Sequence, residues 1–143
     1  MGGDEHRAGG TGGCLCGAVR FAINGPLRPV VACHCSQCRR WTGHFLASTA
    51  ARRADLEIME GRGLRWYRSS PRARRAFCVT CGSSLFWEGD GDGYVAIAAG
   101  TLDGPTGLAL IGHIFVADKG DYYALDDGLP RRPQGGAGAL IAG

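Results

Sequence analysis

Short runs of apolar and aromatic residues, separated by turn residues, recur along most of the chain. Each run is rich in β-branched or aromatic side chains and too short for a typical helix, which favours strands. Gly, Pro and Asp fill the gaps between the runs, as in antiparallel domains with tight turns. The pattern predicts strands at 18–23, 30–34, 45–49, 64–69, 74–79, 84–88, 94–99 and 113–117.

One segment departs from this pattern. Residues 36–42 predict one or two helical turns, with Ser36 as the N-terminal cap because its hydroxyl can accept from a free backbone amide. The sequence therefore predicts an all-β, mostly antiparallel structure with a short helix, organised as one domain over residues 12–130. The flanking residues 1–11 and 131–143 are rich in Gly and small side chains, and we expect them to be loosely ordered.

Composition and patterning place the chain among ordinary soluble domains. It has 143 residues, 45% of them hydrophobic and 20% charged, and its 25 glycines are scattered rather than periodic. No run approaches the roughly 18 apolar residues that span a bilayer, and the first residues lack the apolar core of a secretory signal. We therefore expect a cytoplasmic protein without a membrane partner, whose thiols stay reduced.

Charge is segregated along the chain, although the formal net charge is only +3. Residues 52–75 hold eight arginines, whereas residues 76–130 hold eight acidic residues and Lys119. The simpler interpretation is a basic hairpin folded against the acidic half of the chain. The alternative is that some of these arginines bind an anionic ligand. The small net charge and the absence of a nucleic-acid motif argue against a nucleic-acid partner.

Seven cysteines fall into three clusters, "CLC" at 14–16, "CHCSQC" at 33–38 and "CVTC" at 78–81. Clustered cysteines in a reducing compartment bind metal more often than they pair. A C-x-x-C loop can turn both sulfurs toward one tetrahedral ion, whereas a C-x-C pair needs two further ligands. If the sheet brings the two pairs together, they form a closed structural zinc site of Cys14, Cys16, Cys78 and Cys81.

The remaining Cys33, Cys35 and Cys38 lie within one tight turn. Three protein ligands and a vacant fourth position are the pattern of a catalytic zinc. A fourth protein ligand, His44 or His113, could instead close the site, and loss of zinc could allow a disulfide within the trio. Another partition joins one of the other cysteine pairs to this turn and leaves the second pair without a metal.

Five segments of the sequence resemble the glutathione-dependent formaldehyde-activating (Gfa) family, which shares a domain with centromere protein V. They are "GGCLCGAVRF", "CHCSQCRRWTG", "FCVTCGSSLFW", "AAGTLD" and "HIFVADKGDYYALDDGLP", in that order and with all seven cysteines in place. The resemblance implies a small structure of stacked sheets, of the β-tent type. It also implies two zinc ions per chain, a structural one at Cys14, Cys16, Cys78 and Cys81 and a catalytic one at Cys33, Cys35 and Cys38.

The resemblance further implies an activity, the joining of glutathione to formaldehyde to give S-hydroxymethylglutathione in formaldehyde detoxification. The expected protein is thus a carbon–sulfur lyase or synthase whose partners are a thiol, glutathione or similar, and a small aldehyde. Three thiolate ligands leave zinc a weak Lewis acid, which suits activation of a fourth thiolate better than hydrolysis. Two alternatives are a carrier that binds the thiol or its adduct without catalysis, and a zinc-stabilised binding module with two structural metals.

A few other residues are weaker candidates. His34 could donate to the hydroxyl formed on the aldehyde or be exposed on the turn without a role; in an extended C-H-C it points away from the sulfurs. Arg39 and Arg40 could meet a glutathione carboxylate or lie in solvent. His113 is expected to be half-buried, with its hydrogen bonds satisfied. The aromatic residues expected in the core are Trp41, Phe45, Phe77, Phe86 and Trp87.

Overall fold

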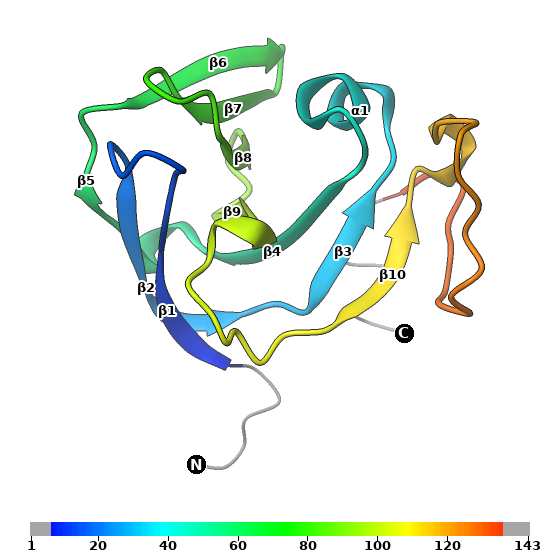
Figure 1. The fold of residues 1–143 in the computed structure, drawn as a ribbon, viewed down its shortest axis with the longest axis horizontal. Helices are drawn as coiled ribbons and strands as arrows, with labels where there is room; N and C mark the ends of the chain where they lie inside the picture. Colours follow the sequence, from blue (N-terminus) through cyan, green and yellow to red (C-terminus); the bar gives the residue numbers. More distant parts are fainter. Residues whose placement is uncertain (1–6, 136–143) are drawn as a thin grey trace.

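The computed structural model describes residues 7–135, which form two sheets and one short helix, α1 (Ser36–Thr42) (Figure 1). The smaller sheet has the strand order β1-β2-β5, with β1 (Arg7–Gly13), β2 (Arg20–Leu27) and β5 (Leu56–Glu60). The larger sheet has the order β10-β3-β4-β9-β8-β7-β6. Its strands are β3 (Val30–Cys33), β4 (Leu46–Arg52), β6 (Leu64–Ser70), β7 (Ala73–Cys78), β8 (Ser84–Gly89), β9 (Tyr94–Ala98) and β10 (Leu110–Ile114). The prediction of a mostly antiparallel β-structure with a short helix is confirmed.

Two strands were missed by the hydrophobic pattern, β1 and β5. Strand β1 has the sequence RAGGTGG, which shows no apolar alternation, and it pairs antiparallel with β2. Residues 7–11, expected to be loosely ordered, thus belong to a strand that backbone hydrogen bonds hold. Its glycines permit close packing, because a Cβ on Gly12 would lie 2.6 Å from the ring of Phe21.

The last strand lies earlier than predicted and runs parallel to its neighbour. Strand β10 pairs with β3 so that His113 lies opposite Ala32 and Ile114 opposite Cys33. It ends before Phe115, whose left-handed backbone (φ 56°) cannot continue a strand. Residues 131–133 then run beside this strand end, where the Arg132 amide donates to the His113 carbonyl at 2.9 Å. Within residues 7–135, no helix combines the length and apolar character that a membrane crossing requires.

Side chains alternate between the two faces of the seven-stranded sheet. Along β9, Val95 and Ile97 belong to the hydrophobic core, whereas Tyr94 and Ala96 line a cavity on the opposite face. The core face packs on the smaller sheet, where Phe21 of β2 meets Phe86 of β8 edge to face, with ring centroids 5.0 Å apart. One sheet therefore supplies both the core and the wall of a cavity.

Two local expectations need correction. Helix α1 is capped by Cys35, not by Ser36, because the Cys35 sulfur accepts from the Cys38 amide at 3.3 Å. Of the aromatic residues expected in the core, only Phe86 is fully buried. The half-buried ones are Trp41, Phe45, Phe77 and Trp87.

The arginine-rich segment is paired with acidic residues from the second half of the chain, as the simpler interpretation of the charge pattern predicts. Glu88 accepts from Arg53 at 2.9 Å and from Arg74 at 2.7 Å, and Arg68 pairs with Asp90 at 2.8 Å. These pairs connect the β6–β7 hairpin and the segment after β4 to strand β8 and the turn after it.

Replacing Phe21 by Ala should lower the free energy of unfolding by about 3–5 kcal/mol, because it removes the ring that joins the two sheets and leaves a cavity. Denaturant titration of the metal-loaded protein measures this loss. Met59→Ala is the control, since Met59 is 62% exposed on β5, and should change stability by less than about 0.5 kcal/mol. Equal effects of the two substitutions would contradict the packing of Phe21 between the sheets.

Candidate metal centre and adjoining cavity

Two loops bring four cysteine sulfurs together at one end of the core. Cys14 and Cys16 follow β1, and Cys78 and Cys81 lie at the end of β7 and in the turn after it. The four Sγ atoms lie within 4.8 Å of one another, and two of the separations, Cys14–Cys16 and Cys16–Cys78, are 3.8 Å. A tetrahedron with zinc–sulfur bonds of ~2.3 Å has edges of about 3.8 Å, so the donor set fits such an ion.

The local backbone explains why these sulfurs converge. Gly82 has φ of 82°, which favours glycine, and its amide donates to the Cys78 carbonyl at 2.7 Å, closing the turn. Ser83, which the sequence pattern did not single out, links the two loops. Its Oγ accepts from the Leu15 amide at 3.0 Å and lies 3.2 Å from Cys81 Sγ. Hydrogen bonds from Ser83 lower the pKa of Cys81 to about 5, which favours the thiolate that metals bind.

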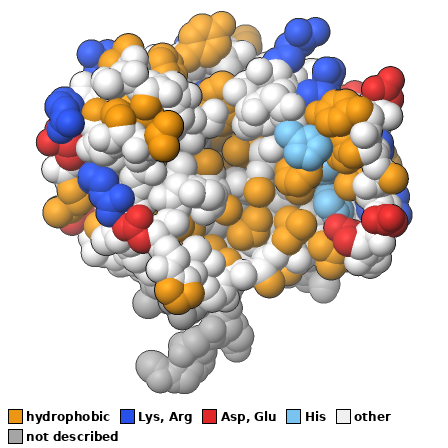
Figure 2. Space-filling model, viewed as in Figure 1, with side chains coloured by type: hydrophobic (Ala, Val, Ile, Leu, Met, Phe, Trp, Pro, Cys, Tyr) orange, Lys and Arg blue, Asp and Glu red, His pale blue; other side chains and the backbone are white. Residues whose placement is uncertain are grey.

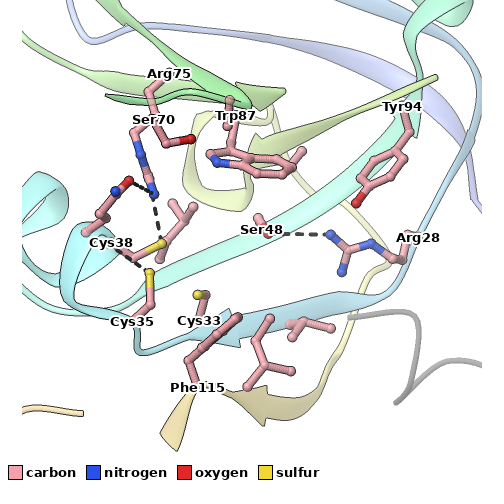
Figure 3. A pocket seen from close by; sticks show the side chains of 16 residues that line it. Arg28, Cys33, Cys35, Cys38, Ser48, Ser70, Arg75, Trp87, Tyr94 and Phe115 are labelled. Atoms are coloured by element: carbon pink, nitrogen blue, oxygen red, sulfur yellow. Dashed lines mark hydrogen bonds between the residues drawn. The ribbon is translucent and has the colours of Figure 1, made fainter. Parts of the chain in front are cut away.

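The other three cysteines, Cys33, Cys35 and Cys38, gather where β3 ends and α1 begins (Figure 3). Their Sγ atoms also lie within 4.8 Å of one another, and within residues 7–135 no fourth His, Cys, Asp or Glu ligand atom joins the group. The two histidines considered as closing ligands are held elsewhere, His44 by a tyrosine hydroxyl and His113 by another histidine and a carboxylate. The sulfurs thus fall into the four-plus-three grouping that their spacing favours, and the group of three is open.

Repulsion among the three sulfurs means that all three cysteines can be ionised together only when a cation lies nearby. Hydrogen bonds from Cys33 and Cys38 lower the pKa of Cys35, whereas contacts with Cys35 and Cys38 raise the pKa of Cys33, because three adjacent thiolates cannot all be charged unaided. Arg75 offsets part of that charge. It is 5% exposed, its Nη1 lies 3.6 Å from Cys38 Sγ, and its Nη2 donates to Gln37 Oε1 at 3.2 Å. A divalent cation bound by the three thiolates would balance the negative charge that Arg75 leaves uncompensated.

A cavity of about 300 Å³ adjoins the trio, on the face opposite the core. The molecule is hollowed near the centre of the face drawn in Figure 2, with hydrophobic side chains inside the hollow. The cysteines lie at one end of the cavity, and Arg28 and Tyr94 lie at the other (Figure 3). The walls between them are mostly apolar and come from several strands: Val31, Leu46, Ala73, Trp87, Ala96 and Ile114.

The structure brings other arginines to this cavity than those the sequence suggested. Arg39 and Arg40 are not among the residues that line it, whereas Arg28 and Arg75 are. Strand alternation could have indicated Arg75, which shares a face of β7 with Ala73. No pattern could have indicated Arg28, because its position depends on how β3 packs beside β4.

A buried chain of hydrogen bonds joins His34, which lies within the cysteine turn, to β10 and to the segment after it. His34 Nε2 lies 2.9 Å from His113 Nδ1, and His113 Nε2 lies 2.8 Å from Asp127 Oδ2. His34 Nδ1 is bonded to the Tyr123 hydroxyl. Burial, together with His113, lowers the pKa of His34 to about 4, so its imidazole is neutral at pH 7.

The carboxylate sets the direction of this chain when both imidazoles are neutral. Because Asp127 can only accept, His113 donates to Asp127 and His34 donates to His113. The Tyr123 hydroxyl then donates to His34. The expectation that His34 is exposed on the turn is wrong, since it is fully buried. His113, expected to be half-buried, is 2% exposed and bonded at both ring nitrogens.

Comparison with known proteins shows which family the chain matches. Residues 10–118 match the family model described as glutathione-dependent formaldehyde-activating enzyme. A Schizosaccharomyces pombe protein named as an uncharacterized lyase is 29% identical over 114 residues, which cover 78% of this chain and 82% of that protein. The crystal structure of a Rhodobacter sphaeroides protein superposes with a TM-score of 0.57 at 27% identity, covering 70% of this chain and 97% of that one.

Replacing Arg75 by Met should weaken metal binding at the trio about 10- to 100-fold, because the thiolates lose the guanidinium that contacts Cys38 Sγ. Competitive Co²⁺ or Zn²⁺ titration with a chromophoric chelator measures the two affinities separately. The affinity of the four-cysteine group should not change. Arg65→Met, on the exposed β6, is the matched control for charge. Equal losses in both variants would show that Arg75 acts only through net charge.

Replacing Tyr123 by Phe should lower the free energy of unfolding by about 1–3 kcal/mol, because the buried His34 Nδ1 loses its donor. Urea titration of the metal-saturated protein measures the change. Tyr122→Phe is the matched control: its hydroxyl lies 3.1 Å from Nδ1 of the exposed His44, and its loss should cost less than about 0.5 kcal/mol. Similar costs for the two tyrosines would argue against a stabilising buried hydrogen bond between Tyr123 and His34.

Proposed function

Because the chain belongs to the family of glutathione-dependent formaldehyde-activating enzymes, we propose that it is a zinc-dependent carbon–sulfur lyase. It joins a thiol, glutathione or a similar one, to formaldehyde or another small aldehyde and catalyses the reverse cleavage. One observation carries the proposal: three cysteine sulfurs, without a fourth ligand among the described residues, line a cavity. In this proposal the trio holds the catalytic zinc, and the four-cysteine group holds a structural zinc that ties β1 to β7.

The ligand set fits thiol chemistry better than hydrolysis. A zinc ion held by three thiolates supplies an open coordination position that stabilises a substrate thiol as thiolate. Cys33, Cys35 and Cys38 hold the ion at the end of the cavity, and Arg75 offsets part of their negative charge. The cavity walls beside these residues are mostly apolar, which strengthens the electrostatic contacts among groups bound there.

The proposed reaction balances without any further reactant. The thiol sulfur forms a bond to the carbonyl carbon of the aldehyde, and the carbonyl π electrons move to oxygen. The oxygen takes up a proton, which balances the proton lost from the thiol. The product is a hemithioacetal, which for formaldehyde is an S-hydroxymethyl compound. In the lyase direction, the carbon–sulfur bond breaks and the hydroxyl proton returns to sulfur.

Replacing Cys35 by Ala should remove one zinc ion and all thiol binding. In native mass spectrometry, the unmodified protein should carry two zinc ions and a glutathione or thiol adduct. Cys35→Ala should keep the zinc of the four-cysteine group and lose the adduct, because two thiolates hold zinc weakly. Ser36→Ala, a change at an exposed position between two proposed ligands, should keep both zinc ions and the adduct.

Rate measurements then separate the enzyme from its alternatives. An enzyme raises the rate of adduct formation from thiol and formaldehyde above the spontaneous rate, and Cys35→Ala abolishes that increase. A carrier binds the thiol without raising the rate, and a binding module with two structural zinc ions forms no adduct. Full activity of Cys35→Ala with two zinc ions retained would exclude the proposed role of the trio.

A further inference from the structure

We propose that the end of the cavity opposite the cysteines is an anion subsite, in which Arg28, with Ser48 and Tyr94, binds a carboxylate of the thiol substrate. The substrate class that this subsite selects is a small, elongated thiol with one carboxylate and no ammonium group, in preference to glutathione. The inference rests on the proposed thiol chemistry at the trio, and the experiment below distinguishes failure of the one from failure of the other.

Arg28 is held in place by its backbone, between the end of β2 and the start of β3. Its amide donates to the Ala50 carbonyl at 3.0 Å, and its carbonyl accepts from the Thr49 hydroxyl. Both partners belong to β4, a strand of the cavity wall. The side chain therefore starts from a fixed position, and its reach into the cavity does not depend on a mobile loop.

The guanidinium of Arg28 has only neutral partners in the described chain. Nη1 donates to the Pro29 carbonyl at 3.2 Å, and Nη2 lies 3.5 Å from Ser48 Oγ. No ion pair within residues 7–135 includes Arg28, whereas six other arginines have one. Burial lowers the pKa of Arg28, as expected for a cation that lacks a compensating charge. Arg28 is half-buried, and a partly desolvated cation without an ionic partner is suited to an anion from outside the chain.

The geometry of the cavity end fits a carboxylate. In Figure 3 the guanidinium of Arg28 points toward Ser48, and the hydroxyl of Tyr94 lies near it, at the end of the cavity away from the cysteines. A guanidinium carries five N–H donors in a planar fork that matches the two oxygens of a carboxylate. The phenol can donate one further hydrogen bond to the same group. A single carboxylate would therefore satisfy this end of the cavity.

Strand register gives the separation between the two ends. Cys33 lies opposite Leu46 on β4, and Arg28 contacts Ser48, two residues further along that strand. Two residues of a strand span about 7 Å. A ligand with its sulfur at the trio and its carboxylate at Arg28 must therefore be elongated, and its middle part faces apolar walls that include Trp87 and Ala96.

The same cavity is poorly suited to glutathione. No Asp or Glu is among the described residues that line it, so an ammonium group would have no ionic partner. Its volume of about 300 Å³ lies at the lower end of the range for small-molecule pockets. Glutathione would bring an ammonium, a second carboxylate and amide groups into this space, and buried polar groups without partners weaken binding.

The test compares two thiols of equal length, 6-mercaptohexanoate and 6-mercapto-1-hexanol, which differ only in the terminal group. Isothermal titration calorimetry of the zinc-loaded protein should show binding of the carboxylate about tenfold or more tighter, because charge-assisted hydrogen bonds to Arg28 add to the thiol–metal interaction. Arg28→Gln should abolish this preference, because the carboxylate loses its charged partner while the alcohol still binds through its thiol. Arg65→Gln, which changes the net charge equally on exposed β6, should keep the preference. Glutathione should bind more weakly than 6-mercaptohexanoate.

The outcomes separate the subsite from the thiol chemistry. Equal affinity for the two thiols, or a preference that survives Arg28→Gln, overturns the subsite while thiol binding at the trio stands. Tighter binding of glutathione than of 6-mercaptohexanoate overturns the substrate class. If neither thiol binds but hexanoate binds with dependence on Arg28, the subsite is supported and the proposed thiol chemistry fails. Absence of all binding overturns both.

Zinc content and circular dichroism would reveal a folding defect in Arg28→Gln. A second pair of variants tests the subsite in that case. Arg28→Lys keeps the charge but loses the planar fork, and Tyr94→Phe removes one donor. Each should reduce the carboxylate preference several-fold, because each removes part of the donor set that binds the carboxylate. An unchanged preference in both variants would overturn the subsite whatever the state of Arg28→Gln.

Discussion

Side chains alternate between the two faces of the seven-stranded sheet, and this alternation positions both the hydrophobic core and the cavity. Side chains on one face pack against the smaller sheet and form the core, as Val95 and Ile97 do on β9. Side chains on the other face form the wall of the cavity, as Tyr94 and Ala96 do on the same strand. Because a shift of register by one residue would exchange the two sets, the packing that stabilises the core also fixes the composition of the cavity.

Electrostatics distinguishes the two ends of that cavity. At one end, three sulfurs concentrate negative charge, and Arg75 is the buried side chain that counters it. At the other end, Arg28 is a cation without a carboxylate partner among the described residues. The end with the three cysteines is therefore suited to a metal cation, and the end with Arg28 is suited to an anion. The walls between the two ends are mostly apolar, so the charges at each end are screened less than they would be in water.

The residues predicted from the sequence are those whose role depends on local spacing. The C-x-C, C-x-C-x-x-C and C-x-x-C spacings identified all seven cysteines, and short apolar runs located most strands. Strand β1 was missed because its glycines carry no hydrophobic signal. Ser83 and Arg28 were missed because their partners come from other parts of the chain, and His34 appeared exposed because nothing local shows that β10 and the segment after it cover the turn.

The spacing of the cysteines along the chain gives the two groups different relations to folding. Cys16 and Cys78 are 62 residues apart, so a metal bound there closes a long loop and is bound fully only once the sheets have met. The trio lies within a six-residue stretch, 33–38, and its ligands are neighbours even in an unfolded chain. Under the proposed function, a chelator would have two effects: removing metal from the four-cysteine group would destabilise the fold, and removing metal from the trio would prevent thiol binding in a protein that stays folded.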